Sequence, residues 1–280
     1  MKNNFAVVFW LTVVYFFIEL IGGLYFNSLA LVTDASFMVV NILGQLITNY
    51  VIWLSRKPPN NHMTFGYERA KVLSGLFNGM ALGFVLFYVL INAYHRIVVP
   101  QPLDAANVFF IALIGLVINV FNLFVLYKRS NDINIKGAFL LILNDTLGSV
   151  GVIISAVVIK YTELYFIDGV TSIFIGLLII YPTHKLIAGS IYILMEGIPT
   201  GIEVEVIERF ILATFPEIVH IKDLHVWAIV PEKILLAAKL RTNGNLYHRE
   251  NIKAMKKKLK ATFGFYDVYI EVYENNEVQN

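Results

Sequence analysis

Long apolar stretches separated by short polar connections fill the chain up to about residue 190. Each stretch is long enough to cross a bilayer as a helix, which takes about 20 apolar residues. The six stretches lie near residues 5–26, 29–54, 70–98, 106–127, 137–159 and 165–189. The pattern therefore predicts an α-helical membrane protein with six transmembrane helices.

Beyond Pro199 the pattern changes to shorter amphipathic segments. Helical spacing of apolar positions predicts helices, and strict alternation predicts strands. In chain order these are a helix over 202–214, strands over 221–230 and 234–241 with a turn at Pro231 and Glu232, a helix over 248–263 and a strand over 266–273. We expect this αββαβ order to form a small α+β domain with both helices on one face of its sheet.

The composition agrees with a membrane protein. Of the 280 residues, 58% are hydrophobic and 15% are charged, which is less charge than a soluble domain of this length carries. The net charge of +2 gives no reason to expect a nucleic-acid partner. Cysteine is absent, which excludes a disulfide framework and a thiolate metal site. The first apolar stretch leads directly into the second, so no cleavable signal peptide is predicted.

Basic residues gather in the second and fourth connections between the apolar stretches. They are Arg56, Lys57, Arg69 and Lys71 in the second, and Lys128, Arg129 and Lys136 in the fourth. Because basic connections stay in the cytoplasm, both termini are predicted to be cytoplasmic. The expected division is a transmembrane domain over 1–198 and a cytosolic domain over 199–280.

The second apolar stretch carries a polar stripe. Asp34, Asn41 and Gln45 are spaced by seven and four residues, so they share one face of a helix. A carboxylate at bilayer depth costs at least a few kcal/mol, so it is expected to face a partner helix or a wet cavity. Two interpretations stay open: the stripe lines an ion path, or it forms a hydrogen-bonded seam between helices.

Further polar residues lie in or near the spans. They are Glu19, Asn78, Asn92, Asn119, Asn122, Asn144, Asp145 and Asp168. No lysine or arginine lies deep in a span to neutralise the acids. Unpaired carboxylates in a membrane suit a cation or proton path and would suit an anion path badly.

Six stretches of the sequence resemble one known family. They are SLALVTDASFM in the second span, FGYERAKVLSGLFNGM at the third, GAFLLILNDTLGSVGVIISAVVI in the fifth, IDGVTSIFIGLLII in the sixth, LMEGIP after it, and KDLHVW in the tail. In order and in spacing, from about residue 5 to 273, they resemble the cation diffusion facilitator family. The resemblance implies a homodimer in a membrane, each protomer with six transmembrane helices and a cytosolic, metallochaperone-like dimerisation domain. The family exports divalent metal, most often zinc, in exchange for protons.

The family's transport site is tetrahedral, with a His-or-Asp and an Asp four residues later on both the second and fifth spans. Carried over to this chain, these positions fall on Phe37 and Asn41, and on Leu141 and Asp145. Phe37 and Leu141 cannot coordinate a cation, and Asn41 offers only a neutral oxygen, which suits harder cations than zinc. Asp34 is not a usual ligand, but its spacing from Asn41 allows both to face Asp145. The predicted metal-handling residues are therefore Asp145, Asn41 and Asp34.

The tail has also lost positions that bind metal in the family. Lys222 and Lys239 stand where family members often have histidines, and an ammonium is no metal ligand. His225 is expected to be packed or hydrogen-bonded. His248 is a lone candidate ligand, although a single histidine at the start of a helix is usually just solvated. His62 lies one position away from a histidine that some members use, so no metal site is predicted there.

Two functional hypotheses follow from the resemblance. The primary one is a divalent-cation efflux transporter, zinc-like and proton-coupled, with a ligand-poor site. The alternative is a transport-deficient member that acts as partner or regulatory subunit of an active paralogue, in a heterodimer. The sequence has no nucleophile–base pair, phosphate loop or cofactor motif, so neither an enzyme nor a tightly bound cofactor is expected. No histidine-rich loop joins the fourth and fifth spans, which favours a bacterial inner membrane as the location.

Overall fold

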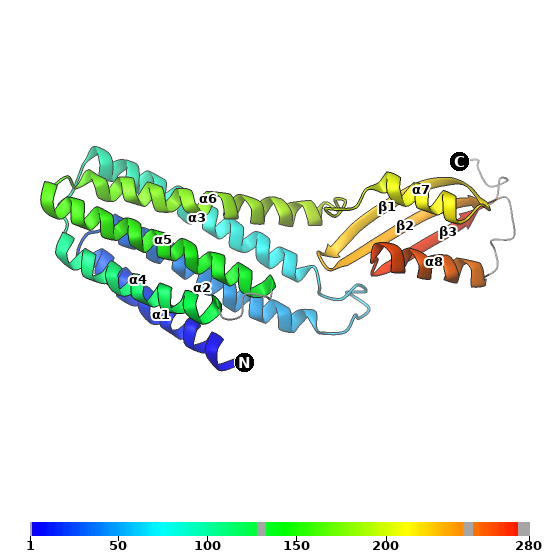
Figure 1. Ribbon diagram of the computed structural model, residues 1–280, viewed down its shortest axis with the longest axis horizontal. Helices are drawn as coiled ribbons and strands as arrows, with labels where there is room; N and C mark the ends of the chain where they lie inside the picture. Colours follow the sequence, from blue (N-terminus) through cyan, green and yellow to red (C-terminus); the bar gives the residue numbers. More distant parts are fainter. Residues whose placement is uncertain (1, 128–132, 243–248, 274–280) are drawn as a thin grey trace. The chain divides into compact units, whose positions relative to one another are not determined.

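The computed structural model describes residues 2–127, 133–242 and 249–273 (Figure 1). Its six long helices are α1 (Lys2–Tyr25), α2 (Leu29–Ser55), α3 (Ala70–Val98), α4 (Ala105–Tyr127), α5 (Ile133–Thr162) and α6 (Phe166–Leu194). Each contains a segment that is long and apolar enough to cross a membrane. The prediction of six transmembrane helices is confirmed.

The chain forms two compact units, which we call the bundle unit and the tail unit. The bundle unit contains Met1–Tyr50 and Ser74–Ile187, and the tail unit contains Val51–Leu73 and Ala188–Asn280. α2, α3 and α6 therefore each contribute residues to both units. The domain boundary expected between residues 198 and 199 stays a prediction.

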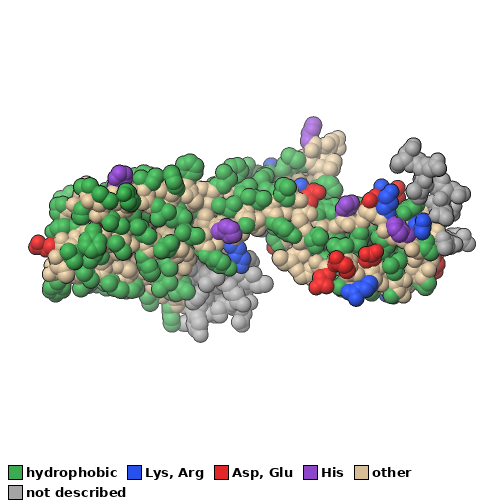
Figure 2. Space-filling view, turned by 90° about the horizontal axis from the view of Figure 1, so that it is seen from above, with side chains coloured by type: hydrophobic (Ala, Val, Ile, Leu, Met, Phe, Trp, Pro, Cys, Tyr) green, Lys and Arg blue, Asp and Glu red, His purple; other side chains and the backbone are tan. Residues whose placement is uncertain are grey.

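An apolar core holds the bundle unit together, and α4 packs against α1 and α5. The buried members of this core come from α2 to α6: Ala30, Leu31, Phe37, Val40, Leu82, Val89, Val108, Ala112, Val152, Ala156 and Ile175. Figure 2 shows that hydrophobic side chains also cover the visible outer face of these helices. An outside of this kind is expected for helices that face lipid.

The tail unit carries the remaining elements in the predicted αββαβ order. They are α7 (Val204–Thr214), β1 (Ile218–Val230), β2 (Lys233–Thr242), α8 (Arg249–Phe263) and β3 (Asp267–Tyr273). The sheet order is β1-β2-β3, with β1 antiparallel to β2 and β2 parallel to β3. β1 ends and β2 begins on either side of Pro231 and Glu232, where the turn was predicted.

α7 and α8 pack on one face of the sheet, as the sequence predicts. Their buried residues form a single apolar cluster with every second residue of β2: Ile207, Ile211, Met255, Leu259, Leu236, Ala238 and Leu240. Alternate residues of a strand share a face, so this cluster marks the helix-covered side. Leu235, on the opposite face of β2, is also fully buried, so other parts of the tail unit cover that face.

Candidate cation site

A small cavity of about 80 Å³ lies between α1, α2 and α5 in the bundle unit. Its lining residues are Val8, Phe9, Thr12, Met38, Asn41, Ile42, Gln45, Leu141, Ile142 and Asp145. The helical spacing of four residues places Asn41 beside Gln45 and Leu141 beside Asp145 on their helices. The structure thus brings three of the four positions implied by the resemblance, together with Gln45, to one cavity.

Phe37 is the fourth position, and it lies elsewhere. Its ring is fully buried in the apolar core of the bundle unit and does not line the cavity. A large ring gains more from burial among aliphatic side chains than from a place beside polar groups. Met38, the next residue, lines the cavity instead.

Asp34 also lies outside the cavity, at a buried position between α2 and α5. Its side chain is 2% exposed and rests against Gly148. A Cβ atom at residue 148 would lie 3.2 Å from Asp34 Oδ1, so a glycine at this position leaves room for the carboxylate. Asp34 and Asp145 therefore lie at different heights along the bundle. Asp145 lines the cavity, whereas Asp34 contacts Gly148, three residues further along α5.

A second buried carboxylate, Glu19 of α1, faces Asp34. The two side chains interact, and Tyr15 donates a hydrogen bond from its hydroxyl to Glu19 Oε1 at 3.0 Å. The Tyr15 ring fits against Gly115 of α4, where a Cβ atom would meet its hydroxyl. Sequence reasoning did not assign Tyr15 or Glu19 to the site. The available signal was their spacing of four residues, which puts a phenol and a carboxylate on one helix face.

One oxygen of each facing carboxylate lacks a hydrogen-bond donor. Glu19 Oε2 and Asp34 Oδ2 are fully buried and have no partner among the described residues. None of the ion pairs in the described part of the chain involves Glu19, Asp34 or Asp145. Two buried carboxylates without a counter-charge are costly, so their presence favours a path for positive charge.

The ligand set at the cavity is poor for a transition metal. Within the described ranges, no three His, Cys, Asp or Glu side chains are arranged to hold a metal ion. The cavity offers one carboxylate, from Asp145, two amide oxygens, from Asn41 and Gln45, and the hydroxyl of Thr12. Zinc sites in proteins use three or four charged or nitrogen ligands, whereas amide oxygens suit harder cations.

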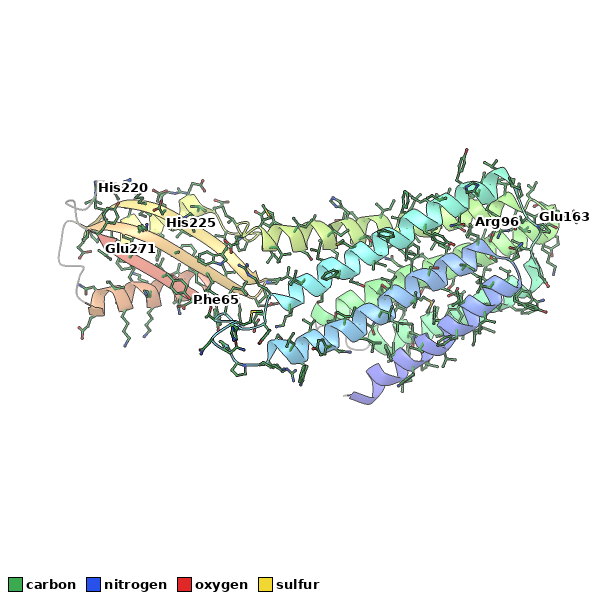
Figure 3. All side chains as sticks on the ribbon, turned by 180° about the vertical axis from the view of Figure 1, so that it is seen from behind. Phe65, Arg96, Glu163, His220, His225 and Glu271 are labelled. Atoms are coloured by element: carbon green, nitrogen blue, oxygen red, sulfur yellow. The ribbon has the colours of Figure 1, made fainter. Side chains whose placement is uncertain are left out.

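In the tail unit an ammonium group lies among carboxylates where the family often places metal ligands. Lys239 Nζ is 3.4 Å from Asp223 Oδ2 and 4.0 Å from Glu271 Oε2. A positive φ of 52° at Asp223 coincides with a bulge in β1 that precedes His225. His225 was expected to be packed or hydrogen-bonded, but its side chain is exposed, so it is not packed. Figure 3 labels its position on the sheet. His248 lies outside the described residues.

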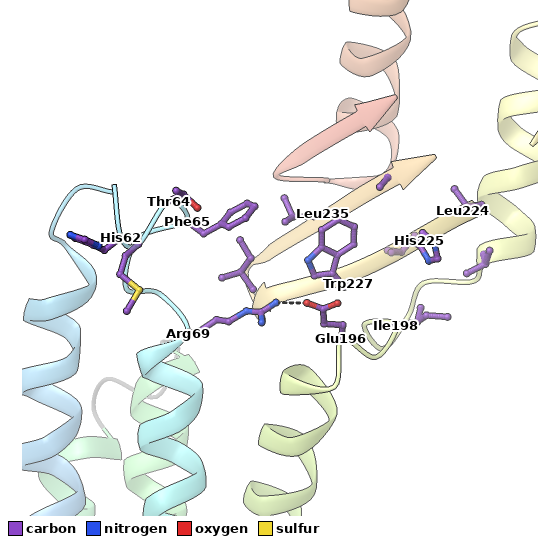
Figure 4. A pocket seen from close by; sticks show the side chains of 16 residues that line it. His62, Thr64, Phe65, Arg69, Glu196, Ile198, Leu224, His225, Trp227 and Leu235 are labelled. Carbon is purple, nitrogen blue, oxygen red and sulfur yellow. Dashed lines mark hydrogen bonds and ion pairs between the residues drawn. The ribbon is translucent and has the colours of Figure 1, made fainter. Parts of the chain in front are cut away.

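A larger cavity of about 850 Å³ lies within the tail unit, on the sheet face opposite α7 and α8 (Figure 4). It is lined by residues 62–66, by Trp227 and Leu235 of the sheet, and by an ion pair of 2.7 Å between Arg69 Nη2 and Glu196 Oε1. His62 also lines the cavity, but it belongs to no metal-binding group among the described residues.

Comparisons with known proteins give a consistent result over nearly the whole chain. Residues 5–195 match the model of the cation efflux transmembrane domain, and residues 199–274 match the model of the cytoplasmic domain of cation efflux proteins. The metal cation efflux system protein CzcD of Cupriavidus metallidurans is 34% identical over 236 residues, which cover 84% of this chain and 74% of that protein. The zinc transporter ZitB of Escherichia coli is 30% identical over 229 residues, covering 81% and 73%. A Bacillus subtilis protein named as a cadmium, cobalt and zinc/H(+)-K(+) antiporter is 34% identical over 231 residues, covering 81% and 74%.

Proposed function

Because the chain belongs to the cation diffusion facilitator family, whose members are transporters and not enzymes, we propose that it exports a divalent cation through a ligand-poor site. The bacterial relatives and the six apolar helices make it an integral inner-membrane protein. In the proposal Asp145 binds the cation with its carboxylate, and Asn41 and Gln45 supply amide oxygens. The cation then moves along the bundle to the Asp34 carboxylate.

The observation that carries this proposal is the set of buried acids without a counter-charge. Asp145 lines the cavity, and behind it the Glu19 and Asp34 carboxylates face each other with one donor-free oxygen each. A seam that only joins helices would be served by neutral amides, which avoid the cost of burying charge.

The proposed cargo is a divalent cation that is held weakly. Zinc would lack two of its usual four ligands, so a harder cation such as manganese competes better here than at an intact family site. Carboxylates must be deprotonated to bind a metal, so binding releases protons, and this is the proposed route to proton exchange. The metal is cargo and not a resident cofactor. Both termini are proposed to be cytoplasmic.

The second candidate function is that of a partner subunit without transport of its own. It is favoured by the two lost ligands, Phe37 in the apolar core and Leu141 at the cavity. The cytoplasmic-domain match supports dimerisation, and in this case the partner is a paralogue with intact ligands.

A proteoliposome uptake assay tests the proposal. Zinc, manganese, iron and cobalt are offered to wild type, to Asp145→Asn and to Glu163→Gln, which removes an exposed carboxylate at the end of α5 as a matched control. The transporter hypothesis expects uptake of at least one metal that Asp145→Asn abolishes and Glu163→Gln preserves. No uptake of any metal by wild type, with transport restored on co-reconstitution with a paralogue, would favour the partner hypothesis instead.

A further inference from the structure

The carboxylate of Asp168, near the start of α6, caps the beginning of a different helix. Its Oδ1 accepts hydrogen bonds from Ser28 Oγ (2.8 Å) and the Ala30 amide (3.1 Å), and its Oδ2 accepts one from the Leu29 amide (2.7 Å). The first amides of a helix have no partner in their own helix, and the helix dipole favours a negative charge there. Asp168 is 1% exposed, so these bonds form away from water and hold α2 to α6.

Arg96 of α3 lies beside this cap and has a hydrogen-bond donor that is not in use. Its Nε is 3.7 Å from Asp168 Oδ2, and its Nη2 donates to the carbonyl and side-chain oxygens of Asn27, each at 3.1 Å. Its Nη1 is buried and has no hydrogen-bond partner among the described residues. A guanidinium can bind a carboxylate with two parallel donors, so Arg96 can take over Asp168 when the α2 amides leave.

α6 and α3 pack closely beside Asp168, and a hollow of about 330 Å³ lies next to this contact. It is lined by Leu29, Asn92, His95, Arg96, Val99 and Gln101. A Cβ atom at Gly169 would lie 2.8 Å from the Ala93 carbonyl oxygen, so α6 approaches α3 without a side chain between them. Asn27 Nδ2 also donates to the Pro102 carbonyl at 2.9 Å, which ties the α1–α2 turn to the segment before α4. Four segments of the chain therefore meet at one end of the bundle.

The candidate cation site is offset toward the other end. α1 lines the cavity with Val8, Phe9 and Thr12, from its first half, whereas α1 ends at Tyr25, next to the turn that Asp168 caps. Figure 3 places Arg96 near Glu163, at the end where α5 passes into α6. A cation leaving the cavity at the Arg96 end must pass Asp34 and then the close contacts around Asp168.

We propose that Asp168 is a positioning residue that latches α2 closed at the end of the bundle opposite the cavity. The inference rests on the proposed function and adds a gate to it. With the latch closed, the three bonds hold the first turn of α2, the helix that carries Asp34 and Asn41. In the open state α2 withdraws and Arg96 binds the carboxylate that α2 has released. The two arrangements give the buried carboxylate a partner in both states, as a bistable element requires.

Amide hydrogen exchange of the full-length protein in nanodiscs tests the latch directly. Asp168→Asn keeps the shape but weakens the bonds to Leu29 and Ala30, so exchange at these two amides should rise at least about tenfold. The matched control is Asp104→Asn, because Asp104 Oδ1 caps α4 within its own helix, accepting from the Asn107 amide at 3.2 Å. The control should leave exchange in α2 unchanged. Equal exchange at Leu29 and Ala30 in wild type and Asp168→Asn would overturn the latch.

Transport kinetics separate a latch from a general scaffold. A latch variant should change the maximal rate of manganese or zinc uptake at least about threefold while KM stays within a factor of two. A loss of thermal stability and a raised KM in Asp168→Asn, matched by Asp104→Asn, would show a scaffold and overturn the proposal. Where Asp168→Asn does not fold, Ser28→Ala removes one bond of the three and should shift exchange in the same direction. The exchange measurement needs no transport, so failure of the proposed function and failure of the latch are distinguishable.

Discussion

Lys233 Nζ lies 3.0 Å from Glu68 Oε1, which ties the turn between β1 and β2 to the segment that leads into α3. Both residues belong to the tail unit, and the ammonium also stands 4.5 Å above the Tyr266 ring. Glu68 Oε2 is 3.4 Å from Lys71, so one carboxylate serves two lysines. This contact makes residues 62–71 part of the tail unit's structure.

The Glu68–Lys233 contact should lose its stabilising effect in acid. Burial acts to raise the pKa of Glu68, but the hydrogen bond from Lys233 and the charges of Lys71 and Lys233 outweigh it and lower that pKa below its usual value. A lowered pKa means that the stabilisation is complete above the ordinary Glu pKa of about 4.3 and is lost as pH falls through the lower value. A double-mutant cycle with Glu68→Gln and Lys233→Met should give a coupling of about 0.5–1 kcal/mol at pH 7. Thermal unfolding of the four proteins measures it, and a coupling that is unchanged at pH 3 would contradict the assignment.

The tail should fold without metal, and two substitutions should make it respond to zinc. Lys222 and Lys239 are direct cross-strand partners, and Lys239 already provides a positive charge between Asp223 and Glu271. A fragment from about residue 200, which keeps α7, α8 and the sheet but lacks residues 62–71, should therefore show little thermal shift with micromolar zinc. Changing both lysines to histidine gives two facing imidazoles, and zinc at 100 times Kd would then add about 2.7 kcal/mol. Lys257→His, at an exposed position of α8, is the control. A large zinc shift in the unchanged fragment would refute this account.

The cavity should accept a rebuilt metal site from α2 and α5. Asn41→Asp with Leu141→His adds a carboxylate and an imidazole beside Asp145, and zinc affinity should rise at least about tenfold, or ~1.4 kcal/mol. Isothermal titration in detergent measures it, with Leu147→His on the exposed side of α5 as control. Tight zinc binding by wild type that survives Asp145→Asn would rule out this cavity as the site.

Phe37→Asp, by contrast, should add no ligand. The expectation from the resemblance was that residue 37 converges with the other three positions, but its ring is buried in the apolar core. Removing a buried phenylalanine costs about 3–5 kcal/mol, and an unpaired carboxylate in its place adds to that cost. The triple variant should therefore unfold at a lower temperature than the double variant and bind zinc no better.

The position of the termini can be tested because the chain contains no cysteine. Glu250→Cys, in α8, should react with a membrane-impermeant maleimide only from the cytoplasmic side. Glu163→Cys, in the turn between α5 and α6, should react only from the outside. The reverse labelling pattern would invert the topology.

The pattern of the sequence was sufficient for the elements but not for the site. The spans and the αββαβ order follow from apolar periodicity, which local spacing encodes. The spacing of Phe37 and Asn41 says that they share a helix face, but it does not say which neighbours that face meets. The pairing of Glu19 with Asp34 and the capping of α2 by Asp168 depend on contacts between helices distant in sequence. The exposure of His225 depends on a bulge that alternation alone does not reveal.

Two glycines lie against buried polar groups: Gly115 against Tyr15, and Gly148 against Asp34. These contacts restrict the order in which substitutions can be accepted over time. A Cβ atom at Gly115 would overlap the Tyr15 hydroxyl, and one at Gly148 would lie 3.2 Å from Asp34 Oδ1, which is tighter than most Cβ contacts. Replacement of either glycine is therefore disfavoured while its polar partner is kept. A shorter residue at position 15 or 34 leaves a void that a larger residue at 115 or 148 can fill. Each pair is therefore expected to be inherited together, with one member changing only after the other has been lost. Among relatives that keep the phenol, Gly115 should be invariant, and among those that keep the carboxylate, glycine should predominate at position 148.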